Sequence, residues 1–593
     1  MKRTEANKEY KWDFSHLYKD ISDWKKELKN LEKNLETFSK FKGKLSSEKI
    51  FLEYIDFDNK NDLIMMKLGQ YLHLQDIDQT NTELQELEGH MMNYYQNLRI
   101  ATSFIAPEIK EIGEKTITGW LNNNSSYQHF IYPMKKFFEQ SKHILDSKDE
   151  ELLSKVSRSR AAVGGMYDVL AYADRQEQNF TWKGKEQPLT QTLLTEIMED
   201  SDPIGDQKIR IEASKLFAKN FVDKKHSFAK IYEGILQSSY ENVKLRNYNS
   251  ALEANLSSDA VPKEVYESLI KIGKKFIKPF QDYNLLLKKH FKFKKFYPTD
   301  RMLKLEKEFK SNFNIEQAKS HIRNALAVLG PDYLQKLEIA WSANRIDYYE
   351  DTNKRDGAYS SGGAGVEPII LMNWDDKLSS VATLAHEIGH SVHTLFADES
   401  QVYPLSEYPI ILAEVASTLN EHLLFEYLYE NSKDKHEKIY LLQQRIGDLT
   451  GTFFRQIQFA DFELECHKLI ENGIPITAEV LAKQYKETEL NFGYDVFEKS
   501  DKLPFGWPRI SHFFHSPFYV YKYAIDVTAS YKLYQDIKNG QVQKALDFLK
   551  AGGHKDPLEI LNELGIDFTN ESTYEPLILA IEKMVADLKS LLN

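Results

Sequence analysis

Apolar residues recur at three-to-four-residue spacing along most of this chain, and this spacing constrains the fold more than any other feature. Glycine (26) and proline (17) are sparse among the 593 residues, so few positions interrupt a helix. Charged residues occupy the opposite faces of the expected helices, as they do where one side packs against a core. The pattern therefore predicts a mainly α-helical protein. It is most regular in residues 62–80, 83–105, 208–240, 264–290, 410–430 and 437–470.

Composition and charge argue against two classes of partner. The chain carries 77 Lys and Arg against 89 Asp and Glu, which gives a formal net charge of −12. This balance argues against nucleic acid, because a nucleic-acid-binding surface needs a net basic face to displace counterions. No stretch approaches the ~18 consecutive apolar residues of a membrane-spanning helix, so we expect no membrane partner. The oligomeric state is left open.

Cysteine usage and the N-terminus point to the cytoplasm. Cys466 is the single cysteine, so the chain has neither an intrachain disulfide nor a four-cysteine zinc site. The basic start at residues 1–3 is not followed by the apolar stretch of a secretory signal. We therefore expect a cytoplasmic protein. A typical domain has ~150 residues, so a chain of this length is expected to hold more than one.

Residues 338–375 interrupt the helical pattern and predict a small β-sheet. Leu337–Ala340, Arg345–Tyr349 and Pro368–Asn373 have the composition of short strands. Before the last of them lies the glycine-rich run 357–365, which we interpret as a mobile loop that approaches a ligand closely. The run has neither of the glycine spacings typical of phosphate-binding loops. The expected sheet thus lies directly before the most informative helix.

The motif at residues 386–390, His-Glu-Ile-Gly-His, predicts a metal site. On a helix, positions i and i+4 are about 40° apart around the axis and about 6 Å apart along it, so His386 and His390 can bind one ion. Glu387 lies about 100° further round, beside the metal, where it can accept a proton from water. Apolar neighbours on one face support the helix: Val381, Leu384, Ala385, Ile388, Val392 and Leu395.

A zinc site of this kind needs a third protein ligand and an open position for water. A third histidine in the pattern HExxHxxGxxH is excluded, because His393 and Phe396 stand where Gly and His are required. The apolar stretch 410–421 carries two acids, Glu414 and Glu421, on one helical face. Burying carboxylates there is unfavourable unless they meet a cation. We predict that Glu414, nearer the helix start, binds the metal and that Glu421 orients a ligand histidine.

These residues resemble a known family. The HEIGH motif followed by Glu-Val-Ala-Ser-Thr-x-Asn-Glu at 414–421 is similar to the M3 metallopeptidases, the thimet oligopeptidase relatives, and within them to the oligoendopeptidase F branch. The resemblance extends over nearly the whole chain. It includes residues 12–18 (WDFSHLY), 357–360 (GAYS), 370–373 (ILMN) and 512–523 (HFFHSPFYVYKY).

The resemblance implies a fold and a domain organisation. The fold is mainly α, with a large helical shell around a deep substrate channel and a small β-sheet next to the HExxH helix. Residues 1–195 would form an N-terminal helical domain of the oligopeptidase F type. Residues 196–593 would form the zinc-peptidase catalytic domain. The implied partners are short peptides.

The resemblance also implies the chemistry of the site. One Zn²⁺ ion is held by His386, His390 and Glu414 and activates a water molecule, while Glu387 is the general base. The implied function is an endopeptidase that hydrolyses internal bonds of short, unfolded peptides. Two alternatives stay open: a zinc carboxypeptidase or dipeptidyl carboxypeptidase on a similar shell, and a peptide-binding protein that keeps the zinc site without turnover. The intact Glu387 argues against the second, because binding alone does not require a base.

The C-terminal segment is expected to contact the reacting carbonyl. The family places a histidine and several tyrosines there, whose hydrogen bonds stabilise the oxyanion. Here His512, Tyr519 and Tyr521 are the favoured candidates, with Tyr523 as a further one. The three tyrosines would share one face of a strand but spread around a helix, so their roles stay open. We also expect the strand near Ile370 to pair with the substrate backbone as an added strand.

Overall fold

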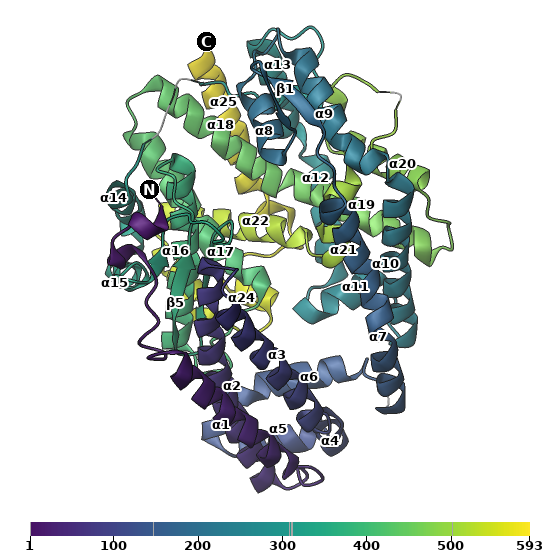
Figure 1. Cartoon of the computed structure of the whole chain (residues 1–593), viewed down its shortest axis with the longest axis vertical. Coiled ribbons are helices and arrows are strands. Elements are labelled where there is room, and N and C mark those ends of the chain that lie inside the picture. The colour runs from purple at the N-terminus through teal and green to yellow at the C-terminus, as the bar shows by residue number, and fades with distance from the viewer. Residues whose placement is uncertain (1, 146, 308, 310–311, 501) are drawn as a thin grey trace. The chain divides into compact units, whose positions relative to one another are not determined.

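Helices make up most of the chain in the computed structural model, which describes residues 2–145, 147–307, 309, 312–500 and 502–593 (Figure 1). The mainly α-helical fold predicted from the apolar spacing is confirmed. Two small β-sheets are present among the described residues. Within this part of the chain, no helix combines the length and the apolar content of a membrane span.

Residue contacts divide the chain into two units, and neither unit is a continuous stretch of sequence. Unit 1 and unit 2 are made of the following segments: Met1–Lys142, Ser311–Leu428 and Leu533–Gly565 for unit 1, and His143–Lys310, Tyr429–Lys532 and Ile566–Asn593 for unit 2. The HExxH motif and both predicted acids lie in unit 1. The His- and Tyr-containing segment 512–523 lies in unit 2.

Unit 1 contains the helix of the metal motif and a three-stranded sheet. Its helices are α1 (Ile21–Ser39), α2 (Glu48–Leu72), α3 (Thr82–Thr102), α4 (Ile105–Ile112), α5 (Glu114–Asn122), α6 (Ile131–Ser141), α14 (Ile315–Leu326), α15 (Pro331–Ala340), α16 (Leu378–Ser400), α17 (Ile410–Asn431), α23 (Val542–Ala551) and α24 (Pro557–Glu563). Its strands are β3 (Ile346–Asp347), β4 (Tyr359–Gly363) and β5 (Val366–Leu371). The last residues of α17 belong to unit 2.

Unit 2 consists of helices and one two-stranded hairpin. Its helices are α7 (Ser147–Asp168), α8 (Gln191–Asp200), α9 (Gln207–Val222), α10 (Lys225–Leu245), α11 (Ala251–Leu256), α12 (Lys263–Lys275), α13 (Lys278–His290), α18 (Lys435–Thr452), α19 (Phe454–Glu471), α20 (Ala478–Asn491), α21 (His512–His515), α22 (Tyr521–Lys538) and α25 (Glu575–Leu592). The hairpin strands are β1 (Asn179–Trp182) and β2 (Lys185–Pro188). The last residues of α22 belong to unit 1.

The sheet of unit 1 has the strand order β3–β5–β4. At Ile370, β5 pairs in parallel with Ile346 of β3 and antiparallel with Ser360 of β4. Strands predicted around 345–349 and 368–373 are thereby confirmed. Both edges of β5 are occupied at Ile370, so the prediction that this strand pairs with a substrate is wrong. The edge strands of this sheet are β3 and β4, and β5 lies between them.

One predicted strand, Leu337–Ala340, is wrong. These residues form the end of helix α15, which begins at Pro331 directly after Gly330. Proline is favoured at the first position of a helix, because its missing N–H would have no intrahelical partner there. The helix started by this proline continues through the residues whose composition resembled a strand.

The glycine-rich run 357–365 forms a β-hairpin with the following strand, which corrects its interpretation as a mobile loop. Tyr359–Gly363 is β4, paired antiparallel with β5. A Cβ built on Gly362 would lie 2.6 Å from the Cα of Pro368 on β5. The close approach that requires a glycine here is therefore between the two strands of the hairpin.

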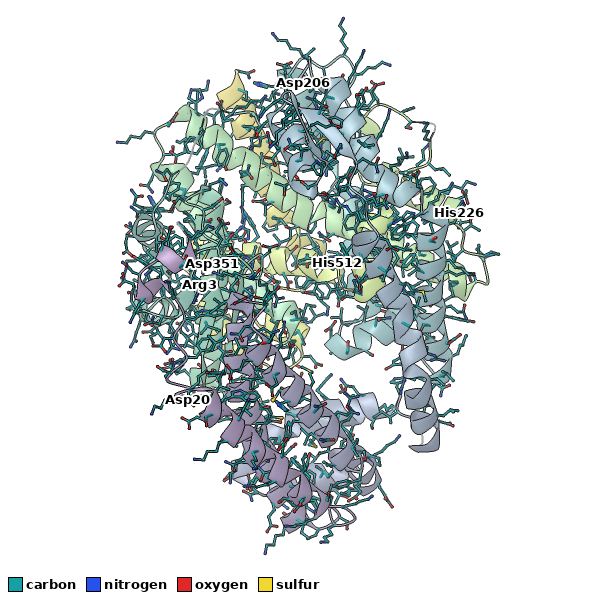
Figure 2. All side chains as sticks on the ribbon, viewed as in Figure 1. Arg3, Asp20, Asp206, His226, Asp351 and His512 are labelled. Carbon is teal, nitrogen blue, oxygen red and sulfur yellow. The ribbon has the colours of Figure 1, made fainter. Side chains whose placement is uncertain are left out.

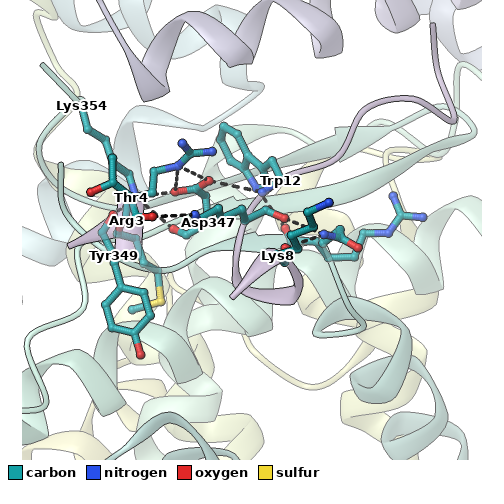
Figure 3. Close-up of polar contacts among 11 residues, drawn as sticks. Arg3, Thr4, Lys8, Trp12, Asp347, Tyr349 and Lys354 are labelled. Atoms are coloured by element: carbon teal, nitrogen blue, oxygen red, sulfur yellow. Dashed lines mark hydrogen bonds and ion pairs between the residues drawn. The ribbon is translucent and has the colours of Figure 1, made fainter. Parts of the chain in front are cut away.

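Asp347 of β3 ties the N-terminal segment to this sheet (Figure 3). Its buried carboxylate accepts hydrogen bonds from Arg3 Nε at 2.8 Å, Lys354 Nζ at 2.8 Å and the Trp12 backbone N–H at 3.2 Å. Two cations and a backbone donor thus satisfy the buried charge. The Trp12 ring packs in one apolar cluster with residues of α1, α2 and α3 and with Ile369 of β5. The N-terminal helices therefore support the sheet, whose strand β5 is followed in the sequence by the helix of the metal motif.

Candidate metal centre

Helix α16 carries the two motif histidines. It packs against β4, β5, α15 and α23, and its apolar residues Val381, Leu384 and Ile388 are fully buried. The ring centroids of His386 and His390 are 4.9 Å apart in edge-to-face orientation. The spacing of one helical turn therefore places both imidazole rings side by side on one face of α16.

Helix α17 crosses α16 in close contact at Gly389. A Cβ built on Gly389 would lie 2.5 Å from Ser417 Cα, so no larger residue fits there unless a helix moves. This contact brings Glu414, near the start of α17, to the histidines. Its Oε2 lies 3.2 Å from His386 Nε2 and 3.5 Å from His390 Nε2. Ligand atoms of the three residues all lie within 4.8 Å of one another.

Glu421 lies two helical turns after Glu414 on α17 and contacts the other side of the His386 ring. Its Oε1 lies 2.7 Å from His386 Nδ1, so Nε2 of the same ring faces Glu414. This is the position that a carboxylate needs to orient a ligand histidine. Ser417 donates a hydrogen bond of 3.0 Å to Glu414 Oε2, which holds the carboxylate of Glu414 in place.

Asn420 lies outside the predicted set, yet it joins three helices at the site. Its buried amide donates a hydrogen bond of 3.0 Å to the carbonyl of Ala385 on α16. Its oxygen accepts one of 2.7 Å from the hydroxyl of Tyr333 on α15. The signal that could have identified Asn420 is an amide within an otherwise apolar helix, since such a group must find partners when it is buried.

The charges of this set attract a cation. Burial lowers the pKa of His386, but hydrogen bonds with Glu414 and Glu421 outweigh burial and raise that pKa to about 10. Burial raises the pKa of Glu414, but hydrogen bonds with His386 and His390 hold it well below its ordinary value. A proton is thus retained between two carboxylates. A divalent ion would supply that positive charge, and two imidazoles with one carboxylate are donors that suit zinc.

Glu387 lies beside this set and is only 6% exposed. Burial raises the pKa of its carboxyl, and the positive charges of His386 and His390 offset part of the rise. The neighbouring backbone N–H of Ser360, on the edge strand β4, also lowers it. A carboxylate with a raised pKa suits a group that takes up a proton near neutral pH and later releases it.

The structure brings together some of the predicted histidine and tyrosine residues of unit 2. His512, labelled in Figure 2, stacks on Tyr519 with ring centroids 5.8 Å apart, and its Nε2 lies 3.4 Å from the hydroxyl of Tyr523. Tyr521 is fully buried instead, and its hydroxyl donates to the carboxylate of Asp259 at 3.4 Å. The group next to His512 is therefore Tyr519 with Tyr523. Tyr521, a favoured candidate from the sequence, is not part of it.

Phe518 shapes the short loop that precedes Tyr519. Its φ of +55° is in the left-handed region, which is uncommon for a phenylalanine. Its ring is buried, with centroids 4.6 Å from His467 and 5.7 Å from Tyr266. Burial raises the pKa of the neighbouring Glu463 to about 8, and the backbone N–H of Phe518 moderates that rise. Packing from α12 and α19 therefore fixes the loop.

Comparison with known proteins gives matches over the whole chain. The family model described as peptidase family M3 matches residues 203–576, and the model described as oligopeptidase F matches residues 108–176. Oligopeptidase PepF of Bacillus subtilis (strain 168) is 31% identical over 599 residues, which cover 100% of this chain and 88% of that protein.

Solved structures share the fold over the same length. A protein from Chlamydophila abortus is similar with a TM-score of 0.90 and 29% identity, covering 100% of this chain and 99% of that chain. The crystal structure of oligoendopeptidase-F from Enterococcus faecium is similar with a TM-score of 0.74 and 26% identity, covering 96% of this chain and 99% of that chain. The mainly α-helical architecture is therefore common to these chains.

Proposed function

Because the chain belongs to peptidase family M3, we propose that it is a zinc-dependent oligoendopeptidase that hydrolyses internal bonds of short, unfolded peptides. The observation that carries the proposal is the group formed by His386, His390 and Glu414, whose ligand atoms lie within 4.8 Å of one another. The buried carboxyl of Glu387 adjoins this group. Together they supply the donors and the base that metal-assisted peptide hydrolysis requires.

His386, His390 and Glu414 would hold one zinc ion. Three protein ligands leave a coordination position for water or substrate. When bound, zinc supplies the Lewis acidity that makes water a nucleophile at neutral pH and polarises a carbonyl. Glu421 holds Nδ1 of His386, which fixes the ring and keeps Nε2 available as a ligand atom.

Glu387 would move the proton during the reaction. Its carboxylate accepts a proton from the attacking water and later delivers it to the nitrogen of the leaving amine. The water thus loses the proton that the amine gains. Burial raises the pKa of Glu387, which favours retention of the proton between the two steps.

His512, Tyr519 and Tyr523 are the proposed donors to the scissile carbonyl. A phenol O–H or an imidazole N–H stabilises the carbonyl oxygen most when that oxygen gains negative charge. Tyr521 is the weaker candidate, because its hydroxyl already donates to Asp259.

β4 is a better candidate than β5 for pairing with an extended peptide, because it lies at the edge in the order β3–β5–β4. A peptide added as a strand is held by main-chain hydrogen bonds, which favours recognition of many sequences. Most strands of a folded domain are already paired, whereas a short, unfolded peptide has free backbone groups along its whole length. This supports short, unfolded peptides as the substrate class.

We keep the domain division expected from the sequence as part of the proposal, with an N-terminal domain over residues 1–195 and the peptidase domain over 196–593. The oligopeptidase F match at 108–176 falls inside the first range, and the M3 match at 203–576 falls inside the second. The cytoplasmic location stays a prediction, which rests on the single cysteine.

An assay with end-blocked peptides tests the activity. Short peptides with an acetylated N-terminus and an amidated C-terminus should be cut at internal bonds, as read by mass spectrometry, and a chelator should stop the cleavage. A carboxypeptidase would leave amidated peptides intact. A zinc-containing binding protein without turnover would leave all peptides intact.

Two substitutions separate the base from the ligands. Glu387→Gln should retain zinc and lower kcat by about 10³-fold, because only the base is removed. Glu414→Gln should lose zinc affinity together with activity. Metal analysis of both purified variants checks these roles. Loss of zinc from Glu387→Gln would mean that Glu387 is structural, and normal zinc binding by Glu414→Gln would mean that the third ligand is misassigned.

A further inference from the structure

Unit 2 contains a cavity of about 570 Å³ that the mechanism above does not use. It is lined by the end of α18, the start of α19, Tyr485 of α20 and the segment from Gly506 to His512. Its volume is in the range of ~300–1,000 Å³ that is usual for sites enclosing small ligands. Because His512 is one of its lining residues, the cavity adjoins a residue proposed to contact the peptide.

Two arginines line this cavity without an acidic partner. Among the residues that the structure describes, neither Arg455 nor Arg509 forms an ion pair with a carboxylate. Arg509 donates to the side-chain oxygen of Gln191 at 3.2 Å and lies over the Phe217 ring at 5.0 Å. Arg455 lies over the Phe459 ring at 5.1 Å. These contacts orient the guanidinium groups but leave their charges uncompensated.

The two guanidinium groups are also close enough to repel each other. Burial lowers the pKa of Arg509, and the positive charge of Arg455 lowers it further. The charge of Arg175 also lowers the pKa of Arg509, by less than Arg455 does, but Arg175 forms its own ion pair with Glu177 at 3.3 Å. Like charges held together in a partly buried place are unfavourable unless an anion joins them.

The remaining lining suits the end of a peptide. Asp448 also lines the cavity and has an interaction of its own. Because two arginines and one aspartate line the cavity, the net charge of these three side chains is positive. The neutral lining residues offer hydroxyl and amide groups, apolar surface and exposed backbone. They include Thr452, Gln456, Ser511 and Phe459. Such a wall accepts both a charged group and the carbon atoms that carry it.

We propose that this cavity binds a carboxylate of the peptide substrate through Arg455 and Arg509. The inference rests on the proposed function, because it takes His512 as a residue that contacts the peptide. Arg509 precedes His512 by three residues, so a carbonyl at His512 and a carboxylate at Arg509 are separated by only a few peptide residues, at about 3.3 Å each. A guanidinium group pairs with both oxygens of a carboxylate, which a lysine cannot do in the same geometry.

The carboxylate has two possible sources, the C-terminus of the peptide and an acidic side chain. A matched pair of peptides tests the first: one sequence, with its C-terminus either free or amidated. The free acid should be cleaved with a kcat/KM higher by about 10- to 100-fold, the range expected for hydrogen bonds to a charged group. The difference should appear mainly in KM, because the carboxylate is bound equally before and during the reaction.

Substitutions identify the arginines. Arg455→Gln and Arg509→Gln should each bring the ratio of kcat/KM between free and amidated peptide towards one. A variant that is only damaged in its fold would cleave both peptides more slowly at an unchanged ratio. An unchanged ratio in both variants would overturn the assignment. Arg160→Gln is the matched control: it removes a positive charge from a surface pair with Glu241, lines no part of this cavity, and should keep the wild-type ratio.

A second series tests acidic side chains. Amidated peptides carry Glu or Gln at each of the first positions after the scissile bond, and a preference for Glu that the arginine variants abolish would identify a side chain as the source. Equal rates in every pair for the wild-type enzyme would overturn the inference and leave the peptidase function intact. A protein that cleaves none of the peptides would overturn the proposed function, and this inference with it.

Discussion

Replacing Gly389 by alanine should push α16 away from α17. The new Cβ would lie 2.5 Å from Ser417 Cα and 2.9 Å from Ser417 N. Carbon atoms in contact prefer about 3.5–4.0 Å, so the helices must separate by roughly 1 Å. Overpacking of this kind costs about 1–3 kcal/mol. Alanine offsets about 1 kcal/mol of that through its better helix propensity, so the free energy of unfolding should fall by at most about 2 kcal/mol.

The same displacement should affect the metal centre more than it affects stability. His386 and His390 lie on α16, whereas Glu414 lies on α17, so separation of the helices moves one proposed ligand away from the other two. A misplacement of about 1 Å can lower kcat/KM by about 10²-fold. The measurements are thermal unfolding, zinc affinity by competition with a chelating dye, and kcat/KM on one peptide.

Gly89→Ala provides the matched control. Gly89 lies within α3, and a Cβ built on it would have no heavy atom within 4 Å. The same substitution should therefore stabilise the protein by up to about 1 kcal/mol and leave zinc affinity and turnover unchanged. If Gly389→Ala binds zinc and turns over like the wild type, the close contact between α16 and α17 does not position the ligands, and the reasoning is refuted.

Four further substitutions test individual groups. Glu421→Gln should lower zinc affinity or activity by about 10- to 100-fold, measured by chelator competition, because the ligand histidine loses its orienting carboxylate; an unchanged affinity would contradict this. Tyr523→Phe should lower kcat by about 10²-fold with little change in KM, whereas Tyr521→Phe should stay within a few-fold, and the reverse order would contradict the grouping around His512. The pKa of Glu463, raised by burial to about 8 from an ordinary value of 4.5, lets the folded protein hold one more proton between these pH values. The stability contributed by that proton is present below pH 4.5 and is lost as pH rises to 8. The melting temperature of Glu463→Gln relative to that of the wild type should therefore rise between these pH values. A difference in melting temperature that stays constant over this range would exclude the ionisation of Glu463.

The helical fold could be predicted because its signal is local and repeated over many turns. The short elements could not, since competing local signals decide them. Leu337–Ala340 has the composition of a strand, but the helix started by Pro331 continues through it. The glycines at 357–365 resembled a loop, but Gly362 is required by the packing of a hairpin against Pro368.

The sequence likewise predicts one part of the candidate site and not the other. The pairing of His386 with His390 follows from one helical turn, so it could be predicted from spacing alone. The surroundings of Tyr519, Tyr521 and Tyr523 could not, because they depend on the left-handed backbone at Phe518 and on the start of α22. Both are set by contacts with residues distant in the sequence, for which the sequence has no short-range signal.

The buried amide of Asn420 has a consequence for the uniqueness of the native state. The faces of α16 and α17 are mostly apolar, and apolar surfaces can pack at several rotations with similar burial. Only one rotation lets Asn420 meet both the carbonyl of Ala385 and the hydroxyl of Tyr333, and any other leaves a polar group dehydrated without a partner. Asn420 therefore selects one arrangement among competing ones, and the place of Glu414 opposite the histidines depends on that selection.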